Sequence, residues 1–474
     1  MANVLVLGAG LGGLSTAMLL ARDGHEVTVL ERDPEAPPPA GDAWRSWERP
    51  GLNQFRQLHL MLPRWHQEMS EALPDVLDEL AAVGGLRVNL LWMLPESMRG
   101  EPQPGDERFE ILTARRPVLE AAIAAIAART SGVTIRRGVA VTGLLTGAPA
   151  LAGVPHVTGV LVAGGQTVRA DLVVDCCGRR SPIAGWLAAL GARPPVQERE
   201  DSGFVYYSRH FRSPSGAQPA ARGRLLQHYD SLSVLTLPAD NGTWAVGFVA
   251  SAADRALRGL RDPVAWHAAL DRYPLVAHWG CASQGAEPIS GVTVLAGIED
   301  RWRRLVVDGT PVATGVVSVG DAWACTNPSL GRGASIGLLH ARALVELLRE
   351  TNATDVEKLA RRFDEVTRAD VEPLYRMTLA FDRHRLAEMN GDVTGIPYET
   401  DDPGWAVSKA LSAAALVDPA TARAMSLMAA LLATPGQLFA EPSVVERIMA
   451  LGAAAPRYPL PGPTRTELLA AVAR

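Results

Sequence analysis

Residues 3–13 read NVLVLGAGLGG, and a segment with helical periodicity, Leu14 to Asp23, follows them directly. An apolar run of strand length that leads into G-x-G-x-x-G and then a helix is typical of a dinucleotide-binding β–α unit. Gly8 permits the tight turn, Gly10 lets the backbone approach a pyrophosphate, and Gly13 allows close helix packing. The N-terminal N–H groups of the helix would then bind the phosphates. These residues predict a Rossmann-like domain.

A second apolar run, Glu26–Leu30, ends at Glu31, which lies 18 residues after Gly13. At this distance a carboxylate accepts hydrogen bonds from the ribose hydroxyls of an adenosine that has no 2′-phosphate. The residues expected to bind the cofactor in this region are Gly8, Gly10, Leu11, Gly12, Gly13, Glu31 and Arg32, with Val139 further along the chain.

A second glycine-rich loop, GDAWACTNPSLGRGAS at residues 320–335, lies between a strand-like run and a helical pattern. A carboxylate at the end of a strand, here Asp321, can bind a ribityl hydroxyl. The Gly331 and Gly333 loop opens a helix whose dipole favours negative charge near the N1/O2 edge of a flavin. The first motif serves NAD and FAD alike, so this second loop favours FAD. Its expected cofactor-binding residues are Gly320, Asp321, Pro328, Gly331, Gly333, Ala334 and Ser335.

Together these motifs resemble those of the para-hydroxybenzoate hydroxylase-like, or class A, FAD-dependent monooxygenase superfamily, with its G-D motif and P-x-x-G-x-G tail. In residues 113–120, TARRPVLE, Arg116 matches the family's R-x-x-L arginine, which reaches the cofactor phosphates. Residues 49–59, RPGLNQFRQLH, resemble the branch that contains squalene and polyether-forming epoxidases. The resemblance implies that Arg49 lies near the phosphates and His59 near the flavin.

The segment DLVVDCCGRRSP at residues 171–182 departs from the family's D-G motif. Cys177 stands where the family has the aspartate, and Asp175 precedes it by two positions, which gives D-x-x-G-R-x-S. This variant resembles some epoxidases, halogenases and reductases of the superfamily. How a nicotinamide cofactor would reduce the flavin is therefore left open.

Because the motifs lie near residues 8, 116, 175 and 321, the FAD domain must be assembled from separated segments. We expect an α/β fold with a discontinuous Rossmann-like FAD-binding domain, an inserted antiparallel-sheet substrate domain and a C-terminal helical region. The expected segments are 1–60, 111–194 and 301–349 for FAD, 61–110 and 195–300 for substrate, and 350–474 for the helical region.

Three runs in the second insertion, Gly203–Arg212, Leu225–Leu237 and Thr243–Ala250, alternate in polarity as antiparallel strands do. Such a sheet could cover the flavin. Candidate pocket residues on it are Tyr206, Tyr207, His210, His228 and Trp244. The catalytic candidates are His59, Tyr207 and Pro328.

Composition narrows the remaining classes of function. The chain has 46 basic and 51 acidic residues, a net charge of -5, and no dense basic run, so a nucleic-acid partner is not expected. No stretch of spanning length stays apolar, and the apolar start lacks a basic n-region, so we expect a cytoplasmic protein. The four cysteines show no C-x-x-C spacing, and no metal site is expected.

The leading hypothesis is a monooxygenase that inserts one oxygen atom from O2, by epoxidation or hydroxylation, into an apolar or aromatic small molecule, which we expect to be a secondary metabolite. NAD(P)H would supply electrons directly or through a flavin reductase. An FAD-dependent dehydrogenase or alkene reductase would use the same motifs, and a scaffold that binds FAD without catalysis is a further alternative. A halogenase fits less well, because halogenases of this family place a lysine between flavin and substrate and the only lysines here, Lys358 and Lys409, follow the G-D motif.

Overall fold

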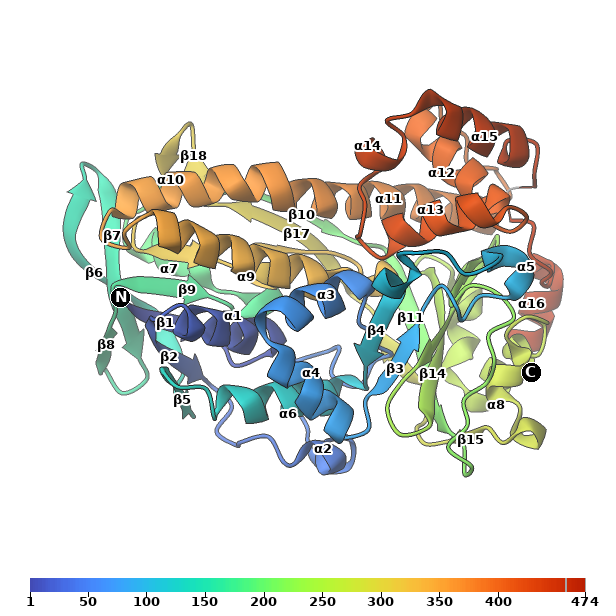
Figure 1. The fold of residues 1–474 in the computed structure, drawn as a ribbon, viewed down its shortest axis with the longest axis horizontal. Helices are drawn as coiled ribbons and strands as arrows, with labels where there is room; N and C mark the ends of the chain where they lie inside the picture. Colours follow the sequence, from blue (N-terminus) through green and yellow to red (C-terminus); the bar gives the residue numbers. More distant parts are fainter. Residues whose placement is uncertain (457, 474) are drawn as a thin grey trace.

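The computed structural model describes residues 1–456 and 458–473. A parallel sheet with its helices forms one half of the molecule, and a larger antiparallel sheet forms the other (Figure 1). Most of the C-terminal helices lie along the upper side of both halves in this view.

The parallel sheet has five strands in the order β20-β9-β1-β2-β5, and all four pairings are parallel. Its central strand β1 pairs through Val4 with Val27 of β2 and Leu172 of β9. Strands from distant parts of the chain therefore end side by side at one edge. Their bounds are Asn3–Leu7 for β1, Glu26–Glu31 for β2, Val133–Arg137 for β5, Leu172–Asp175 for β9 and Val316–Ser318 for β20.

Alternation along β1 sends its side chains into two different cores. Val4 and Val6 share one core with helices α1, α6 and α9, whereas Leu5 and Leu7 share another with α7 and the sheet β6-β7-β8. The parallel sheet is thus buried on both faces, as its continuous apolar sequence indicates. These elements are α1 (Leu11–Arg22), α6 (Arg116–Ala127), α7 (Ile183–Ala189), α9 (Gly333–Glu350), β6 (Val141–Leu151), β7 (Val154–Val162) and β8 (Thr167–Arg169).

The antiparallel sheet has the order β12-β13-β14-β11-β15, and β16 also pairs with β11. The run Leu225–Leu237, which alternation predicted as one strand, forms a hairpin of two. Helices α8 and α16 cover the back of this sheet, where Trp266 and Leu468 join one core. The bounds are β11 (Phe204–Arg212), β12 (Leu226–His228), β13 (Leu232–Pro238), β14 (Thr243–Ser251), β15 (Glu287–Pro288), β16 (Thr293–Leu295), α8 (Pro263–Leu270) and α16 (Arg465–Val472).

Helices α3 (Pro63–Ala72) and α4 (Pro74–Ala82) pack in the core of the parallel sheet through Trp65, Met69 and Val76. This part of segment 61–110 thus shares a core with the parallel sheet, and its assignment to the substrate domain stays a prediction. Smaller elements are α2 (Ala40–Ser46), α5 (Glu96–Arg99), β3 (Leu86–Asn89), β4 (Glu110–Thr113), β10 (Val196–Asp201), β17 (Glu299–Arg304), β18 (Val306–Val307), β19 (Thr310–Pro311) and β21 (Ala324–Cys325).

The C-terminal helices begin with α10 (Val356–Val366), a π-helical turn and the long α11 (Glu372–Thr394). Asp402 and Asp418 cap the next two helices, α12 (Pro403–Ala414) and α13 (Pro419–Ala429), by accepting backbone N–H groups ahead of a proline. Two further helices, α14 (Pro435–Leu438) and α15 (Pro442–Gly452), complete the group. None of the helices in the described ranges is long and apolar enough to cross a membrane.

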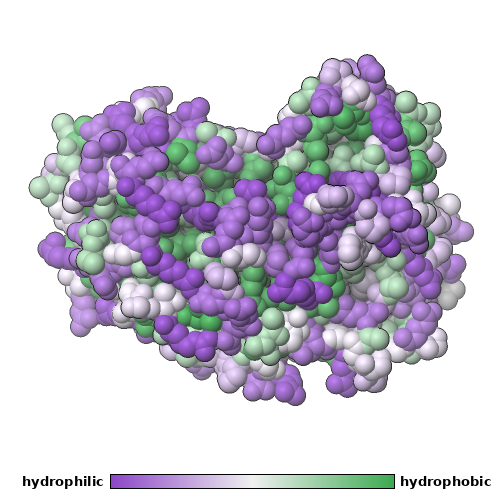
Figure 2. Space-filling model, in the orientation of Figure 1, coloured by the Kyte–Doolittle hydropathy of each residue, from purple (hydrophilic) through white to green (hydrophobic). Residues whose placement is uncertain are grey.

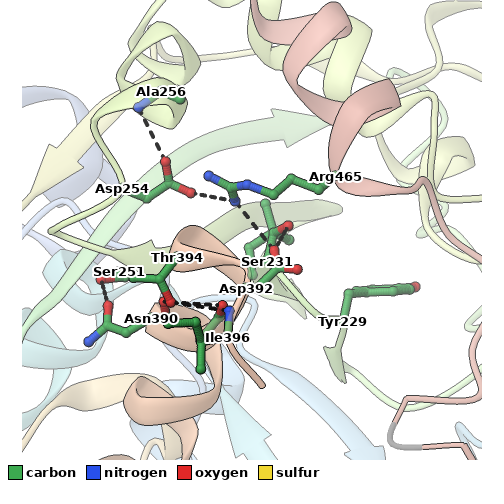
Figure 3. Close-up of polar contacts among 12 residues, drawn as sticks. Tyr229, Ser231, Ser251, Asp254, Ala256, Asn390, Asp392, Thr394, Ile396 and Arg465 are labelled. Carbon is green, nitrogen blue, oxygen red and sulfur yellow. Dashed lines mark hydrogen bonds and ion pairs between the residues drawn. The ribbon is translucent and has the colours of Figure 1, made fainter. Parts of the chain in front are cut away.

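A polar cluster joins the last helix, α16, to the antiparallel sheet and to α11 (Figure 3). Arg465 lies 2.8 Å from the carboxylate of Asp254 and 3.3 Å from that of Asp392. Asp254 is 1% exposed in its side chain and also accepts the N–H of Ala256, while Asp392 accepts the hydroxyl of Ser231. Arg465 is therefore the cation that neutralises a buried carboxylate.

We predict that Arg465→Ala lowers the free energy of unfolding by about 1–3 kcal/mol, because it leaves the Asp254 carboxylate buried without its cation. Thermal melting of both proteins measures the loss. Arg383→Ala is the control, since Arg383 pairs with Glu200 at the surface and such pairs contribute about 0–1 kcal/mol. Equal losses in the two variants would contradict the prediction.

Candidate active site

A cavity of about 780 Å³ begins at the carboxyl ends of the parallel strands and continues beneath the antiparallel sheet. It brings together both glycine-rich loops, which lie more than 300 residues apart in the sequence. The predicted site residues that line it are Gly8, Gly10, Leu11, Gly12, Gly13, Glu31, Arg32, Arg49, His59, Arg116, Val139, Gly320, Asp321, Pro328, Gly331, Gly333 and Ala334. Tyr207 and Ser335 do not line it.

The first glycine loop is built as its sequence predicts. Gly8 has φ +99°, and a Cβ there would lie 2.8 Å from the carbonyl oxygen of Cys176. A Cβ on Gly13 would lie 2.0 Å from the carbonyl oxygen of Gly8, so α1 begins in direct contact with the turn. A Cβ on Gly10 or Gly12 would meet nothing within 4 Å. The backbone of the α1 N-terminus is therefore open toward the cavity.

Acidic and basic side chains form ion pairs beside this loop. Glu31 is buried and accepts hydrogen bonds from the backbone N–H groups of Ala9, at 2.8 Å, and Asp33, at 3.0 Å. Arg49 lies 2.9 Å from Glu31 and 2.8 Å from Glu120. Burial lowers the pKa of Arg49, but Glu120 and Glu31 more than offset this, so its pKa is raised. Arg49 stays charged and is already paired with protein carboxylates.

Arg116 also meets Glu120, at 2.7 Å, and Gln54, at 3.1 Å. Both arginines that the resemblance assigns to the phosphates thus line the cavity while bound to carboxylates. Their contact with a phosphate remains a prediction. The N–H groups of α1, which have no such competitor, are the better placed anion donors.

The second loop presents a free carboxylate. The side chain of Asp321 lines the cavity and forms no hydrogen bond with another residue in the described part of the chain. Gly331 has φ +66°, which reverses the chain before α9. The predicted residue Ser335 lies in the first turn of α9 and is fully buried, so its side chain does not line the cavity, and its contact with the cofactor stays a prediction. Helix periodicity turns it away from the cavity.

His59 lines the cavity, and its Nε2 is buried without a hydrogen-bond partner among the described residues. Burial, with a smaller effect of nearby Arg116, lowers the pKa of His59 to about 3. The imidazole is therefore neutral at physiological pH. Buried polar atoms are normally hydrogen-bonded, so this nitrogen is available to a molecule bound in the cavity.

These features fit FAD. An exposed helix N-terminus, a free carboxylate at a strand end and an orphaned imidazole nitrogen meet in one elongated cavity. The pyrophosphate would lie over Gly10 and Gly12, the ribose near Glu31, and the ribityl chain near Asp321.

In the D-x-x-G-R-x-S segment, the aspartate stabilises the turn and the residues that follow it line the cavity. Asp175 is buried at the end of β9, where it accepts the N–H of Cys177 at 3.0 Å and the hydroxyl of Ser181 at 2.5 Å. It therefore holds the turn together. The following residues, Cys177, Gly178 and Arg179, line the cavity.

Strand β11 places Tyr206, not Tyr207, at the cavity. Tyr206 lines it, whereas Tyr207 is packed with Phe248 in the core behind the sheet. Successive side chains in a strand point to opposite faces, so only one of the two can face the cavity. The catalytic role expected of Tyr207 is thus corrected. Among the other aromatic candidates His228 lines the cavity, while His210 and Trp244 lie elsewhere.

A buried polar network extends from Tyr206 to α11. The Tyr206 hydroxyl donates to Oδ1 of Asn327 at 2.5 Å, and the Asn327 amide donates to Oδ1 of Asp382 at 3.2 Å. Ser329 also donates to Asp382, at 3.1 Å. Burial raises the pKa of Asp382 to about 7, and nearby Asp300 adds to the shift. The sequence indicated Tyr206 and the loop that contains Asn327 and Ser329, but not Asp382, because Asp382 lies over 50 residues later, in a helix without a motif.

Much of the remaining cavity wall is apolar, and it comes from both insertions and the C-terminal helices. Leu58, Leu60 and Leu235 share it with Phe381 of α11 and with Met425 of α13. Figure 2 shows hydrophobic residues gathered in the hollow beside the C-terminal helical lobe. The C-terminal helices, in which the sequence shows no recognisable chemistry, thus close the far end of the cavity.

Comparison with known proteins agrees with this geometry. Residues 3–102 match the family model described as FAD dependent oxidoreductase. This part of the chain is similar to FAD-dependent oxidoreductases. The chain is 28% identical over 420 residues to protein Rv3254 of Mycobacterium tuberculosis, and the alignment covers 81% of this chain and 82% of that protein. It is 37% identical over 102 residues to aklavinone 12-hydroxylase RdmE of Streptomyces purpurascens, which covers 21% of this chain and 16% of that enzyme.

Solved structures with the same fold include PqsL of Pseudomonas aeruginosa, described as a probable FAD-dependent monooxygenase, with TM-score 0.57, 18% identity and coverage of 82% of this chain and 99% of that one. The 2-methyl-3-hydroxypyridine-5-carboxylic acid oxygenase has TM-score 0.57 and 15% identity over 82% of this chain and 93% of that one. CmlS, a flavin-dependent halogenase, has TM-score 0.60 and 16% identity over 91% of this chain and 76% of that one. The predicted fold class and its likeness to the flavin monooxygenases are confirmed.

We predict that Asp321→Ala weakens FAD binding by about 10- to 150-fold, the equivalent of about 1.5–3 kcal/mol for a hydrogen bond to a charged group. Titration of the apoprotein with FAD measures the change. Asp321→Asn, which keeps one acceptor oxygen, should lose less. Unchanged FAD affinity in the alanine variant, or a lower melting temperature of its apoprotein, would contradict a ligand-binding role.

We predict a pH-dependent gain of stability in Asp382→Asn. The folded state raises the Asp382 pKa from 3.8 to about 7, so it binds more protons than the unfolded state, and the carboxyl's contribution to stability falls as pH rises through this interval. Asparagine removes that loss and keeps an acceptor oxygen. The melting temperature of the variant minus that of the wild type should be higher at pH 8 than at pH 5. In the exposed control Asp401→Asn, the difference in melting temperature from the wild type should be the same at pH 5 and pH 8. A difference that is also the same at both pH values in Asp382→Asn would contradict the raised pKa of Asp382.

Proposed function

We propose that this oxidoreductase is a monooxygenase that inserts one oxygen atom from O2 into an apolar or aromatic small molecule. The observation that carries the proposal is the single cavity, which joins the FAD-binding loops to an apolar chamber beneath the antiparallel sheet. A substrate in that chamber would lie against the Pro328 loop, beside the predicted flavin position.

Bound FAD would supply the redox chemistry and the activation of O2. The protein's own residues have separate tasks. Leu235, Leu237 and Phe381 exclude water from the chamber, which favours oxygen transfer over loss of the oxidant. The neutral imidazole of His59 offers Nε2 for one hydrogen bond, and the hydroxyl of Tyr206, held by Asn327, can accept one from a substrate. These groups orient the substrate without providing a nucleophile.

The positions of both lysines oppose a halogenase. Lys358 is exposed on α10, and Lys409 of α12 is not among the residues that line the cavity. A dehydrogenase or alkene reductase would use the same cavity, and turnover without O2 would identify it. The source of electrons is proposed to be NAD(P)H, acting directly or through a flavin reductase.

We predict that enzyme loaded with FAD and supplied with NADPH, alone or together with a flavin reductase, transfers one labelled atom from isotope-labelled O2 to a productive substrate, while the other atom leaves as water. The first probes are fused-ring aromatic compounds, including aklavinone, the compound named for the hydroxylase relative. Product mass gives the answer. Unlabelled product, chloride incorporation, or loss of a double bond under anaerobic conditions would each overturn the monooxygenase proposal in favour of a named alternative.

A further inference from the structure

One side chain in the chamber lacks the partner that its charge requires. Arg224, in the loop before β12, lines the cavity, and its Nε is buried without a hydrogen-bond partner among the described residues. Its guanidinium makes one hydrogen bond there, from Nη2 to the carbonyl oxygen of Ala422 on α13, at 3.3 Å. No carboxylate of the described residues lies within ion-pair distance of it. A guanidinium can donate five hydrogen bonds, so most of its capacity is unused.

The surroundings of Arg224 make this state costly. The chamber around it is lined by Leu225, Leu226 and Met425, with no aspartate or glutamate among the lining residues on this side. Burial alone lowers the pKa of Arg224 to about 10, which still leaves it charged at neutral pH. Buried charges in proteins are normally paired, because desolvation without a counter-ion costs several kcal/mol.

Another arginine of the cavity shows the contrast. Arg332 also lines the cavity, but it donates to the hydroxyl of Thr378 at 3.2 Å and lies beside the carbonyl oxygen of Met428, at 3.5 Å. Met428 is in the last turn of α13, where the helix dipole attracts a cation. Asp382 adds a further attraction to Arg332. Nε of Arg332 is also buried without a hydrogen-bond partner among the described residues. Its two hydrogen bonds and the attraction of Asp382 nevertheless compensate part of its charge, whereas Arg224 has a single hydrogen bond and no such carboxylate nearby.

We propose that the substrate carries a carboxylate, which forms an ion pair with Arg224 while its apolar body extends along β12 and β13 toward Tyr206. The fork of the guanidinium matches the two oxygens of a carboxylate. One uncompensated cation balances one carboxylate, whereas a diphosphate would need more positive charge than this wall supplies. This inference rests on the proposed function in one respect, because it assumes that the apolar chamber binds the substrate.

The test compares two probes of the same shape, 2-naphthoate and 2-naphthamide, by titration calorimetry on protein that holds oxidised FAD. The wild type should bind the naphthoate about tenfold or more tightly than the amide, since a buried charge pair is worth at least this ratio. Arg224→Gln should remove that preference and leave amide binding within about twofold. Arg222→Gln, an exposed arginine in the same loop, is the matched control and should keep the preference.

Equal binding of the two probes by the wild type would overturn the proposal. So would a carboxylate preference that persists in Arg224→Gln, or one that is lost only in Arg332→Gln. If neither probe binds, the melting temperature of Arg224→Met, compared with that of the wild type, distinguishes a ligand-binding role of Arg224 from a structural one. A residue kept for a ligand is replaced by an apolar one without loss of stability in the unliganded chamber, whereas a fall of about 3 °C or more would show that the guanidinium serves the fold. The binding test involves no turnover. Its result therefore does not depend on whether the oxygen-transfer experiment succeeds.

Discussion

The contact between α1 and the end of β1 determines where the cofactor site can form. Gly13 approaches the carbonyl oxygen of Gly8 so closely that a Cβ would overlap it at 2.0 Å, and Gly8 in turn touches the backbone of Cys176. Three segments of backbone therefore meet without intervening side chains. Since β1 is the central strand, between β2 and β9, this meeting point also sets the positions of Glu31 and Asp175 at the neighbouring strand ends. The open helix N-terminus is a consequence of that packing.

Features that depend on local rules could be predicted from the sequence. The strand Asn3–Leu7 has the predicted bounds, and the helix after Gly333 and the strand before Gly320 agree to within a few residues. Glycine spacing, capping and apolar periodicity act over one or two turns, so they can be recognised in isolation. The cavity lining contains nearly all the residues of the two motifs for the same reason, because a motif fixes the local backbone and the parallel sheet places the strand ends together.

Features that depend on which face of a strand or helix other elements cover could not be predicted. Every residue from Phe204 to Ser208 is buried, so alternation identified a strand but gave no sign of whether Tyr206 or Tyr207 faces the ligand. The apolar segment from Met61 to Leu80 is interrupted at Pro74, which starts a second helix, and both helices pack on the parallel sheet. The closing helices α12 and α13 are rich in alanine and methionine, and nothing in that composition specifies the surface they cover.

The distribution of charge separates the two ends of the cavity. At the cofactor end Arg49 and Arg116 are neutralised by Glu31 and Glu120 before any ligand arrives, so a phosphate would have to displace a carboxylate to reach them. Backbone N–H groups require no such exchange, so we expect the phosphates to bind at the N-terminus of α1. At the opposite end the walls are apolar, and Arg224 has no such carboxylate. Arginine is so common in this chain that its sequence position says nothing about which one binds a ligand. What marks Arg224 is that it makes one hydrogen bond and no ion pair among the described residues, beside the apolar side chains of Leu225, Leu226 and Met425, and the packing of α13 over the β12 loop creates that environment.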